Sequence, residues 1–302
     1  MIDLTSCLPY RGRFAPSPTG PLHFGSLIAA TGSYLQAKSH AGEWQIRIDD
    51  IDPPRELPGA SDCILKTLEQ FGFEWDGPVS YQSQHTEQYQ NALDTLQEKG
   101  LVYPCVCTRK SIAATQTSSA GKNIYPGTCR NGLAEGNKAR MLRINTQQAI
   151  IQFEDKLQGH CQYDLENEVG DFVVFRADGL FAYQLATGID DANQKITEVV
   201  RGFDLLDSTP CQIHVQQSLG LSSPDYCHLP IVINSAGQKL SKQNLAPALD
   251  PQNVQQLLWQ ALNFLGQKPD TSLANEPLIN LWQWAIDHWQ LSKIPPENQI
   301  SQ

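Results

Sequence analysis

Residues 13–27 read Arg-Phe-Ala-Pro-Ser-Pro-Thr-Gly-Pro-Leu-His-Phe-Gly-Ser-Leu. The short, largely apolar run 12–15 predicts the end of a β-strand, and the prolines and Gly20 that follow exclude regular structure. From Ser26 onward the spacing of apolar residues predicts a helix, with Gly42 as its stop. A turn between a strand and a helix presents backbone N–H groups at the helix N-terminus, where phosphate is favoured.

Two residues in this turn favour a nucleotide site. Gly25 leaves room for a planar group close to the backbone, and His23 can donate a hydrogen bond to phosphate oxygens. A proline-rich connection with a core histidine explains the same residues equally well. The turn alone therefore leaves both interpretations open.

The sequence around this turn predicts an α/β fold with a parallel sheet. Residues 43–48 predict a second strand, which ends in Asp49, Asp50 and Asp52. A strand, a helix and a strand within about 40 residues form a βαβ unit. Ligands of such sheets bind beyond the carboxyl ends of the strands, where both the turn and Asp49 are expected to lie.

Weaker patterns predict the other elements. The expected helices span 60–76, 86–99, 207–220, 254–265 and 278–289. The expected strands span 101–103, 140–144, 150–154, 172–176, 196–200 and 228–233. Asp178-Gly179 predicts a hairpin turn between strands at 173–176 and 181–183. The polar tail 293–302 is expected to fray.

Composition limits the classes of function. The 302 residues carry a net charge of −10, which disfavours non-specific nucleic-acid binding. Any RNA contact would need a local basic surface, although such a cluster is more often a solvated face; the candidates are Arg109, Lys110, Lys122, Arg130, Lys138, Arg140 and Arg143. No signal peptide and no membrane span are expected, and eight irregularly spaced cysteines indicate reduced thiols in the cytoplasm.

The segment from Cys105 to about Gly136 is rich in Ser, Thr, Gly and Asn and has little periodicity. Cys105, Cys107 and Cys129 give it three thiols, and zinc can replace hydrophobic burial in a segment with so small a core. Reduced structural cysteines are the alternative. The fourth ligand is not obvious, with Cys161 and His160 among the candidates.

Three stretches in this order identify a family. They are residues 13–26, residues 46–53 (Ile-Arg-Ile-Asp-Asp-Ile-Asp-Pro) and residues 239–242 (Lys-Leu-Ser-Lys). Over about residues 10–250 the chain resembles the glutamyl branch of the class I aminoacyl-tRNA synthetases. The resemblance implies a Rossmann-type catalytic domain with a zinc-containing mixed α/β insertion and a short helical C-terminal region. The expected boundaries are 1–104 for the first half of the catalytic domain, 105–190 for the insertion, 191–250 for the second half with its lysine loop, and 251–302 for the C-terminal region, without an anticodon-binding domain.

The family's chemistry implies roles for two residue sets. Glutamate would attack the α-phosphate of ATP, with Mg²⁺ expected, to form glutamyl adenylate and pyrophosphate. His23 and Lys242 would be catalytic, although Lys242 alone would be taken for a surface lysine. The implied ATP-binding residues are His23, Gly25, Ser26, Lys239, Ser241 and Lys242.

The resemblance also implies an amino-acid pocket and a metal site. Arg13 would grip a carboxylate with two hydrogen bonds, and Asp49, where the family usually has Glu, would hold the α-ammonium. Without the resemblance, Tyr183 would be a packing residue and Arg201 a surface ion-pair partner. The implied glutamate-binding residues are Arg13, Phe14, Ala15, Pro16, Ser17, Asp49, Tyr183 and Arg201. One structural zinc would be held by Cys105, Cys107, Tyr125 and Cys129.

Two departures from the family point to an unusual acceptor. Ser26 stands where many members have a second histidine, and only about 60 residues follow Lys242, where full-length members carry a long anticodon-binding region. A short paralogue shares both features and attaches glutamate to queuosine at the wobble position of tRNA(Asp). We therefore expect a monomer that takes glutamate, ATP and the queuosine-bearing anticodon arm. The alternatives are charging of a tRNA 3′ end, or a non-catalytic binding module of the same fold.

Overall fold

The computed structural model describes residues 9–113, 116–117, 123–233 and 247–301. Its centre is the predicted βαβ unit, formed by β1 (Arg11–Phe14), α1 (Phe24–Ser39) and β2 (Glu43–Ile48). β1 and β2 are parallel, and β3 (Ser80–Tyr81) extends the sheet in parallel beyond β2. Helix α1 ends at Ser39 rather than at Gly42, because Ala41 already has a φ of 49°.

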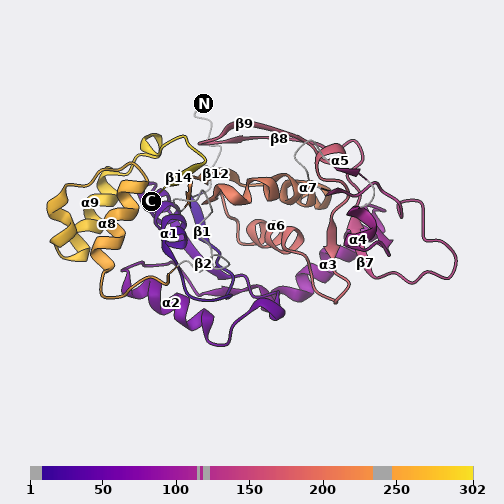
Figure 1. Ribbon diagram of the computed structural model, residues 1–302, viewed down its shortest axis with the longest axis horizontal. Coiled ribbons are helices and arrows are strands. Elements are labelled where there is room, and N and C mark those ends of the chain that lie inside the picture. The colour runs from indigo at the N-terminus through magenta and orange to yellow at the C-terminus, as the bar shows by residue number, and fades with distance from the viewer. Residues whose placement is uncertain (1–8, 114–115, 118–122, 234–246, 302) are drawn as a thin grey trace, which may run out of the picture.

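A second parallel set of strands lies against the first. β11 (Glu198–Gly202) pairs in parallel with β12 (Asp225–Leu229), which meets β8 (Ile150–Asp155), and β9 (Gly159–Asp164) is antiparallel to β8. The Thr197 N–H, just before β11, donates to the Arg11 carbonyl at 2.9 Å and so brings β11 beside β1. The mixed α/β architecture with a parallel sheet agrees with the sequence-based expectation (Figure 1).

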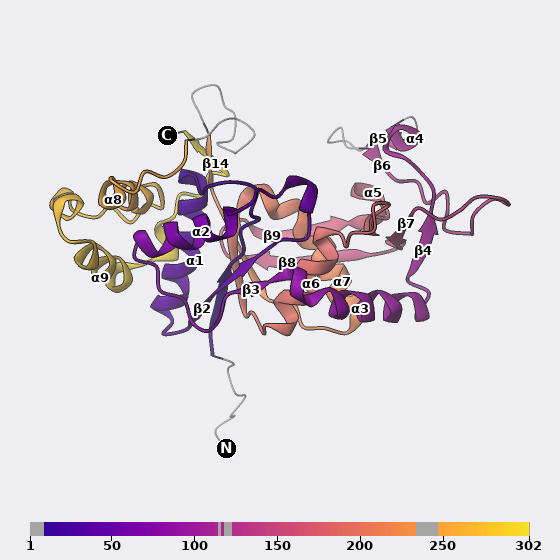
Figure 2. The ribbon, with the colours of Figure 1, turned by 90° about the horizontal axis from the view of Figure 1, so that it is seen from below.

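The cysteine-bearing region forms one end of the molecule. Its sheet is antiparallel and has the order β10 (Val173–Phe175), β7 (Met141–Ile144), β4 (Val102–Cys105). Around it lie α4 (Arg109–Ala113), β5 (Gln116–Thr117), β6 (Asn123–Ile124) and α5 (Leu165–Glu168). Helices α3 (Thr86–Glu98), α6 (Tyr183–Asn193) and α7 (Thr209–Leu219) pack on one another between this end and the centre (Figures 1 and 2).

The C-terminal helices form the opposite end (Figures 1 and 2). α8 (Val254–Phe264) and α9 (Leu278–His288), the two helices that the apolar periodicity predicts here, pack on α1. The Trp282 indole donates to the Phe71 carbonyl at 2.9 Å, and that of Trp289 donates to Gln36 Oε1 at 2.8 Å. The expectation of a frayed tail is wrong, because β14 (Gln299–Ser301) pairs in parallel with β13 (Ile231–Ile233).

Three further expectations need correction. α2 (Ala60–Gln70) stops well before residue 76, since Gly72 has a φ of 74°. The turn at Asp178-Gly179 is present, with the Arg176 N–H donating to the Leu180 carbonyl, but Tyr183 begins helix α6 and belongs to no strand. Pro230 divides the expected strand 228–233 into β12 and β13.

Short 3₁₀ helices complete the described chain: η1 (Pro53–Arg55), η2 (Gln82–His85), η3 (Phe203–Ser208), η5 (Thr271–Asn275) and η6 (Leu291–Lys293). Of the helices in the described ranges, none has the length and apolar character that a membrane crossing requires.

Candidate active site

A cavity of about 560 Å³ opens at the carboxyl ends of β1, β2, β11 and β12. It is lined by every residue that the family resemblance assigns to glutamate, and by three of the six assigned to ATP. These lining residues are Arg13, Phe14, Ala15, Pro16, Ser17, His23, Gly25, Ser26, Asp49, Tyr183 and Arg201. Lys239, Ser241 and Lys242 lie outside the described residues.

His23 caps helix α1 at the edge of this cavity. Its Nδ1 accepts a hydrogen bond from the Ser26 N–H at 3.3 Å, and its own N–H donates to Ser26 Oγ at 3.4 Å. This reciprocal pair is a capping box and explains why the helix begins two residues before Ser26. A neutral imidazole that accepts at Nδ1 carries its proton at Nε2, which is thereby a donor.

The chain on both sides of residues 234–246 lies at the cavity. Ile231 and Val232 line it before this segment. After the segment, Ala248 forms an antiparallel bridge with His23, and the Leu249 N–H donates to the Leu22 carbonyl at 2.9 Å. The described residues before 234 therefore lie at the cavity, and those after 246 lie beside the histidine turn.

Arg13 already grips a carboxylate, but it is a carboxylate of the protein. Its Nε and Nη2 donate to the two oxygens of Asp191, each at 3.1 Å. Arg13 therefore makes the two hydrogen bonds to a carboxylate that the family resemblance implies, but it makes them to Asp191 and not to a substrate. The Nη1 side of the guanidinium is what Arg13 has left for a ligand in the cavity.

Arg47 connects Asp191 to Asp49, which lines the cavity. The sequence did not identify Arg47 as a functional residue. It is fully buried, and its Nε donates to Asp49 Oδ1 while its Nη1 donates to Asp191 Oδ1, both at 2.7 Å. Asp190 lies 3.7 Å from the same guanidinium. A charged residue inside the otherwise apolar half of strand 43–48 was the available signal.

Asp49 and Asp191, the two carboxyl groups that accept hydrogen bonds from Arg47, have different pKa values. Burial raises the pKa of Asp49 to about 6, even though Arg47 opposes the shift. Burial also acts to raise the pKa of Asp191, but Arg13 and Arg47 outweigh it and lower that pKa to about 2. Asp191 is therefore a permanent anion at neutral pH, whereas Asp49 changes charge near pH 6.

Asp190 connects the cluster to helix α3. Its carboxylate accepts hydrogen bonds from Gln82 Nε2 at 2.8 Å, Tyr89 Oη at 2.7 Å and His85 Nδ1 at 2.8 Å. The hydrogen bond to Asp190 raises the pKa of His85. These contacts fix α6, which carries both Asp190 and Asp191, relative to the cavity.

Arg201 is buried, and the surface ion pair that its sequence context favours is not what the structure shows. Its Nη2 donates to Thr209 Oγ1 at 2.7 Å, its Nε donates to His228 Nε2 at 3.1 Å, and its Nη1 lies 3.5 Å from Tyr183 Oη. Thr209 and His228 carried no sequence signal. Tyr183 is half-buried and lines the cavity beside Arg201.

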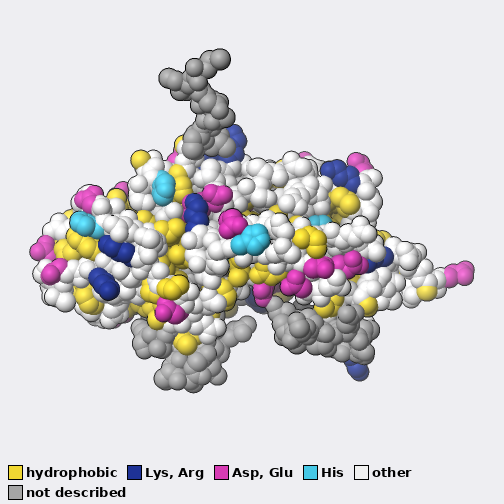
Figure 3. Space-filling model, turned by 90° about the horizontal axis from the view of Figure 1, so that it is seen from above, with side chains coloured by type: hydrophobic (Ala, Val, Ile, Leu, Met, Phe, Trp, Pro, Cys, Tyr) yellow, Lys and Arg dark blue, Asp and Glu magenta, His cyan; other side chains and the backbone are white. Residues whose placement is uncertain are grey.

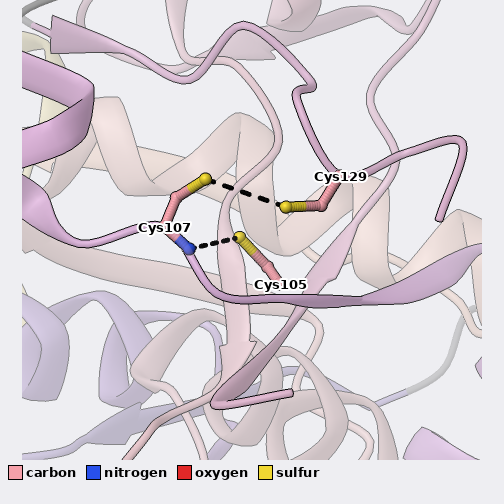
Figure 4. Close-up of side chains that lie close together, drawn as sticks. All are labelled: Cys105, Cys107 and Cys129. Atoms are coloured by element: carbon pink, nitrogen blue, oxygen red, sulfur yellow. Dashed lines mark hydrogen bonds between the residues drawn. The ribbon is translucent and has the colours of Figure 1, made fainter. Parts of the chain in front are cut away.

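The three cysteines of the 105–136 segment converge (Figure 4). The sulfur atoms of Cys105, Cys107 and Cys129 all lie within 4.8 Å of one another, and Cys107 Sγ is 3.7 Å from Cys129 Sγ. Tyr125 Oη lies 3.4 Å from Cys105 Sγ and accepts from the Cys129 N–H at 2.9 Å. The arrangement fits a metal that binds thiolates, with the tyrosine oxygen adjacent.

The alternative fourth ligands lie elsewhere. His160 and Cys161 are on β9, where His160 pairs with Glu154 at 2.7 Å and the Cys161 thiol faces the Gly159 carbonyl. Neither belongs to the sulfur cluster of the described residues.

Two arginines proposed for RNA contact instead hold this end of the molecule together. Arg143 is buried, donates to Cys105 Sγ at 3.3 Å and stacks 4.0 Å from the centre of the Tyr125 ring. Arg130 pairs with Asp171 at 2.6 Å and with Glu166 at 2.9 Å. Lys110, Lys138 and Arg140 are exposed, as a solvated face requires.

A second cavity, of about 870 Å³, adjoins the first. The two share Arg55 and Tyr183, and the second reaches Cys107 in the sulfur cluster. At its wall, Arg176 pairs with Asp52 at 3.0 Å and with Asp178 at 2.6 Å. The second cavity thus leads from the active-site candidate toward the cysteine-bearing end.

The charged side chains on the face shown in Figure 3 do not form a basic surface in the part that the structure describes. In the part of it that the structure describes, acidic side chains form a row, while Lys and Arg side chains are scattered singly. This distribution agrees with the net charge of −10 and does not suit a polyanion.

The sequence of this chain is similar to those of known proteins. Residues 10–265 match the model of the family described as tRNA synthetases class I (E and Q), catalytic domain. A glutamyl-Q tRNA(Asp) synthetase from Dechloromonas aromatica is 54% identical over 97% of this chain and 98% of its own length. One from Chromobacterium violaceum is 52% identical over 95% of each chain.

Solved structures match as well. A glutamate tRNA ligase from Elizabethkingia meningosepticum, in complex with its amino acid, superposes with a TM-score of 0.78 at 25% identity, over 96% of this chain and 66% of its own. The glutamate-tRNA synthetase of Elizabethkingia anophelis, with a TM-score of 0.79 at 24% identity, shares the fold over 97% of this chain and 68% of its own.

Proposed function

This chain belongs to the class I tRNA synthetases of the E and Q type, and we propose that it activates L-glutamate with ATP and transfers the glutamate to queuosine at the wobble position of tRNA(Asp). The observation that carries the proposal is the lining of the main cavity. Among the lining residues, Arg13, Arg201 and Asp49 supply the two cations and one anion that suit a substrate with two carboxylates and one amine; Arg55 and Asp204 also line the cavity. The names and near-complete alignment of the curated relatives support the acceptor.

In the first step a carboxylate oxygen of glutamate attacks the α-phosphorus of ATP. A new P–O bond forms as the bond to the β-phosphate bridge breaks, and pyrophosphate leaves. Negative charge grows on the phosphate oxygens, so donors that are already in place lower the barrier. The Nε2–H of His23 and the backbone N–H groups at the start of α1 are such donors, and we assign Lys242 the same task. ATP is expected to arrive with Mg²⁺.

Different residues would bind the carboxylates and the ammonium group of glutamate. The Nη1 sides of Arg13 and Arg201 would bind carboxylates, with Tyr183 beside Arg201. Asp49 would bind the α-ammonium through an ionised carboxylate.

Glutamate-dependent exchange of pyrophosphate into ATP distinguishes an enzyme from a binding module. If no exchange occurs, with or without tRNA, the activation step is excluded.

The acidity of Asp49 makes glutamate binding depend on pH. Asp49 attracts the ammonium only when ionised, and its pKa is about 6. Below pH 6 the ionised fraction of Asp49 falls about tenfold per pH unit. The KM for glutamate in the exchange assay should therefore rise by up to about tenfold per pH unit, while the KM for ATP changes little. Asp49→Asn should bind glutamate weakly with no such rise. An unchanged wild-type KM between pH 7 and pH 5 would remove Asp49 from ammonium binding.

In the second step a hydroxyl of the queuosine cyclopentenediol attacks the glutamyl carbonyl and releases its proton to solvent, and AMP leaves with the electrons of the broken anhydride bond. The second cavity supports an approach path for this nucleoside, because it adjoins the first at Tyr183 and Arg55. Arg176 is part of its wall and is partly exposed.

Replacing Arg176 should therefore weaken transfer more than activation. Arg176→Ala removes a cation from the wall and leaves Asp178 without its partner and Asp52 paired with Arg55 alone, which weakens the attraction for phosphate. We expect a several-fold higher KM for tRNA and a salt slope smaller by about one, with exchange in the absence of tRNA within about twofold of wild type. Lys66→Ala, at an exposed position on α2, is the matched control. Equal KM values for tRNA in both variants would exclude this path.

We also propose one structural zinc, held by Cys105, Cys107, Cys129 and Tyr125. Four protein ligands leave no open position, so the metal would join β4 to the 125–129 turn without taking part in catalysis. Burial raises the pKa of Tyr125, and a bound cation would be what stabilises its phenolate.

Metal analysis tests the ligand set. Cys129→Ser should reduce bound zinc from about one per chain to near zero and lower the melting temperature, because the metal contributes folding free energy. Cys161→Ser is the matched control, since its sulfur lies on β9 and outside the cluster. Full zinc content in Cys129→Ser, or its loss in Cys161→Ser, would contradict the proposed site. Because the proposed reaction uses ATP and tRNA, we propose that the chain acts in the cytoplasm; a monomer stays our prediction.

A further inference from the structure

Three side chains from three strands form a buried row behind the cavity. Asp155 ends β8, His228 lies on β12, and Arg201 lies on β11 directly opposite His228 in the register. Asp155 Oδ2 is 2.6 Å from His228 Nδ1, and His228 Nε2 is 3.1 Å from Arg201 Nε. His228 is 0% exposed, and of the three only Arg201 lines the cavity.

The contacts fix the protonation of the imidazole. Asp155 Oδ1 accepts from the backbone N–H groups of Leu157 and Gln158, at 3.0 and 2.9 Å, as an ionised carboxylate does. Asp155 Oδ2 can only accept a hydrogen bond, so His228 Nδ1 must carry a proton. Arg201 can only donate, so Nε2 must present a lone pair. Burial lowers the pKa of His228, which agrees with a neutral ring.

The row leaves Arg201 one side for a ligand. Its Nε is held by His228, and its Nη2 is held by Thr209 Oγ1 at 2.7 Å and the Leu205 carbonyl at 3.4 Å. Nη1 is directed toward Tyr183. The negative charge of Asp155, one imidazole away, also balances the buried guanidinium while no substrate carboxylate is bound.

We propose that His228, held in one tautomer by Asp155, is a positioning residue that aims the Nη1 side of Arg201 at a carboxylate of the amino-acid substrate. The proposal rests on the proposed function in one respect, namely that Arg201 binds glutamate. It goes further by assigning specificity to two residues that touch no substrate. A neutral imidazole suits the task, because it carries a donor and an acceptor at fixed positions on opposite sides of one rigid ring.

Two substitutions of His228 separate positioning from packing. In His228→Gln the side-chain oxygen reaches as far as Nε2 and can still accept from Arg201. In His228→Asn the amide reaches only as far as Nδ1, so it keeps Asp155 and loses Arg201. We expect the KM for glutamate in pyrophosphate exchange to rise less than about threefold in His228→Gln and about 10- to 100-fold in His228→Asn, since the latter loses a hydrogen bond to a charged group. The KM for ATP should change less than twofold in both.

Asp155→Asn tests the tautomer with little change in volume. Its amide can donate to His228 Nδ1, which moves the ring proton to Nε2 and against Arg201. We expect a rise in the KM for glutamate of at least about tenfold, again with little change in the KM for ATP. Equal effects of His228→Gln and His228→Asn, or a larger effect of His228→Gln, would show that the residue only fills space.

A measurement on the unaltered protein covers the case in which the variants fail to fold. The ¹⁵N shifts of the His228 ring should show a protonated Nδ1 and an unprotonated Nε2 at pH 7, and the opposite tautomer or a doubly protonated ring would overturn the proposal. A wild-type chain with this tautomer but without glutamate-dependent exchange would instead refute the proposed function. The two failures are therefore distinguishable.

Discussion

Replacing Arg47 with methionine should lower the free energy of unfolding by about 3–5 kcal/mol at pH 7, because it leaves buried Asp49 without its cationic partner and Asp191 with Arg13 alone. Arg47 donates to Asp49 and to Asp191 at 2.7 Å and lies 3.7 Å from Asp190. Methionine fills a similar volume, so the loss would report charge rather than a cavity. Urea unfolding measures it.

The chain offers a matched control for this substitution. Arg11 pairs with Glu43 at 2.7 Å, but both side chains are partly exposed. Arg11→Met should therefore cost less than about 1 kcal/mol. Equal losses in the two variants would show that the buried cluster is not held together by Arg47.

The pH dependence of Arg47→Met has a definite sign. Carboxyls that have lost their cation bind protons more tightly in the folded chain than in the unfolded chain. The stability of the variant relative to wild type should therefore recover as the pH falls from 7 toward 5 and the carboxylates become neutral. A deficit that stays constant over this range would argue against uncompensated charge as its cause.

Replacing Arg201 with alanine is the second large effect that we expect. The variant removes a buried cation from the cavity, together with the hydrogen bonds that Arg201 donates to His228 and Thr209. A loss of about 2–5 kcal/mol corresponds to a fall of about 30- to 4000-fold in kcat/KM for glutamate in pyrophosphate exchange. The KM for ATP should stay within about threefold of wild type, since ATP is assigned to the histidine turn.

Arg201→Lys is the informative companion. Lysine keeps the charge but cannot bond His228, Thr209 and Tyr183 at once, so it should restore only part of the activity. Melting temperatures close to that of wild type would show that the loss belongs to the site. Arg201→Ala with kcat/KM for glutamate within threefold of wild type would exclude Arg201 from substrate binding.

The sequence predicted the site best where its signals are local. The run of prolines after β1, the helix that follows and the acidic end of β2 are each contained in a few residues. The rule that parallel strands end at one edge then brought Arg13, His23 and Asp49 together. The resemblance to the synthetase family added Tyr183 and Arg201, which neither spacing nor composition would have joined to them.

Long-range partners of charged residues were the part that the sequence could not supply. Asp190 and Asp191 lie on α6, whose first residue, Tyr183, was expected in a strand, so the partners of Arg13 and Arg47 were missed. His228 and Asp155 come together only when β12 pairs with β8, and Arg201 joins them from β11. Arg130 and Arg143 resembled a solvated basic face because Asp171, which contacts both, lies 41 and 28 residues away from them.

The acceptor is the central claim, and the position of the label after charging tests it most directly. Total tRNA that contains queuosine is charged with labelled glutamate and then cut with a nuclease, and the labelled fragment is identified. We expect the label in the anticodon arm of tRNA(Asp), and none with tRNA that lacks queuosine. Label on the 3′-terminal adenosine would contradict the proposal and identify the chain as an enzyme that charges the tRNA end.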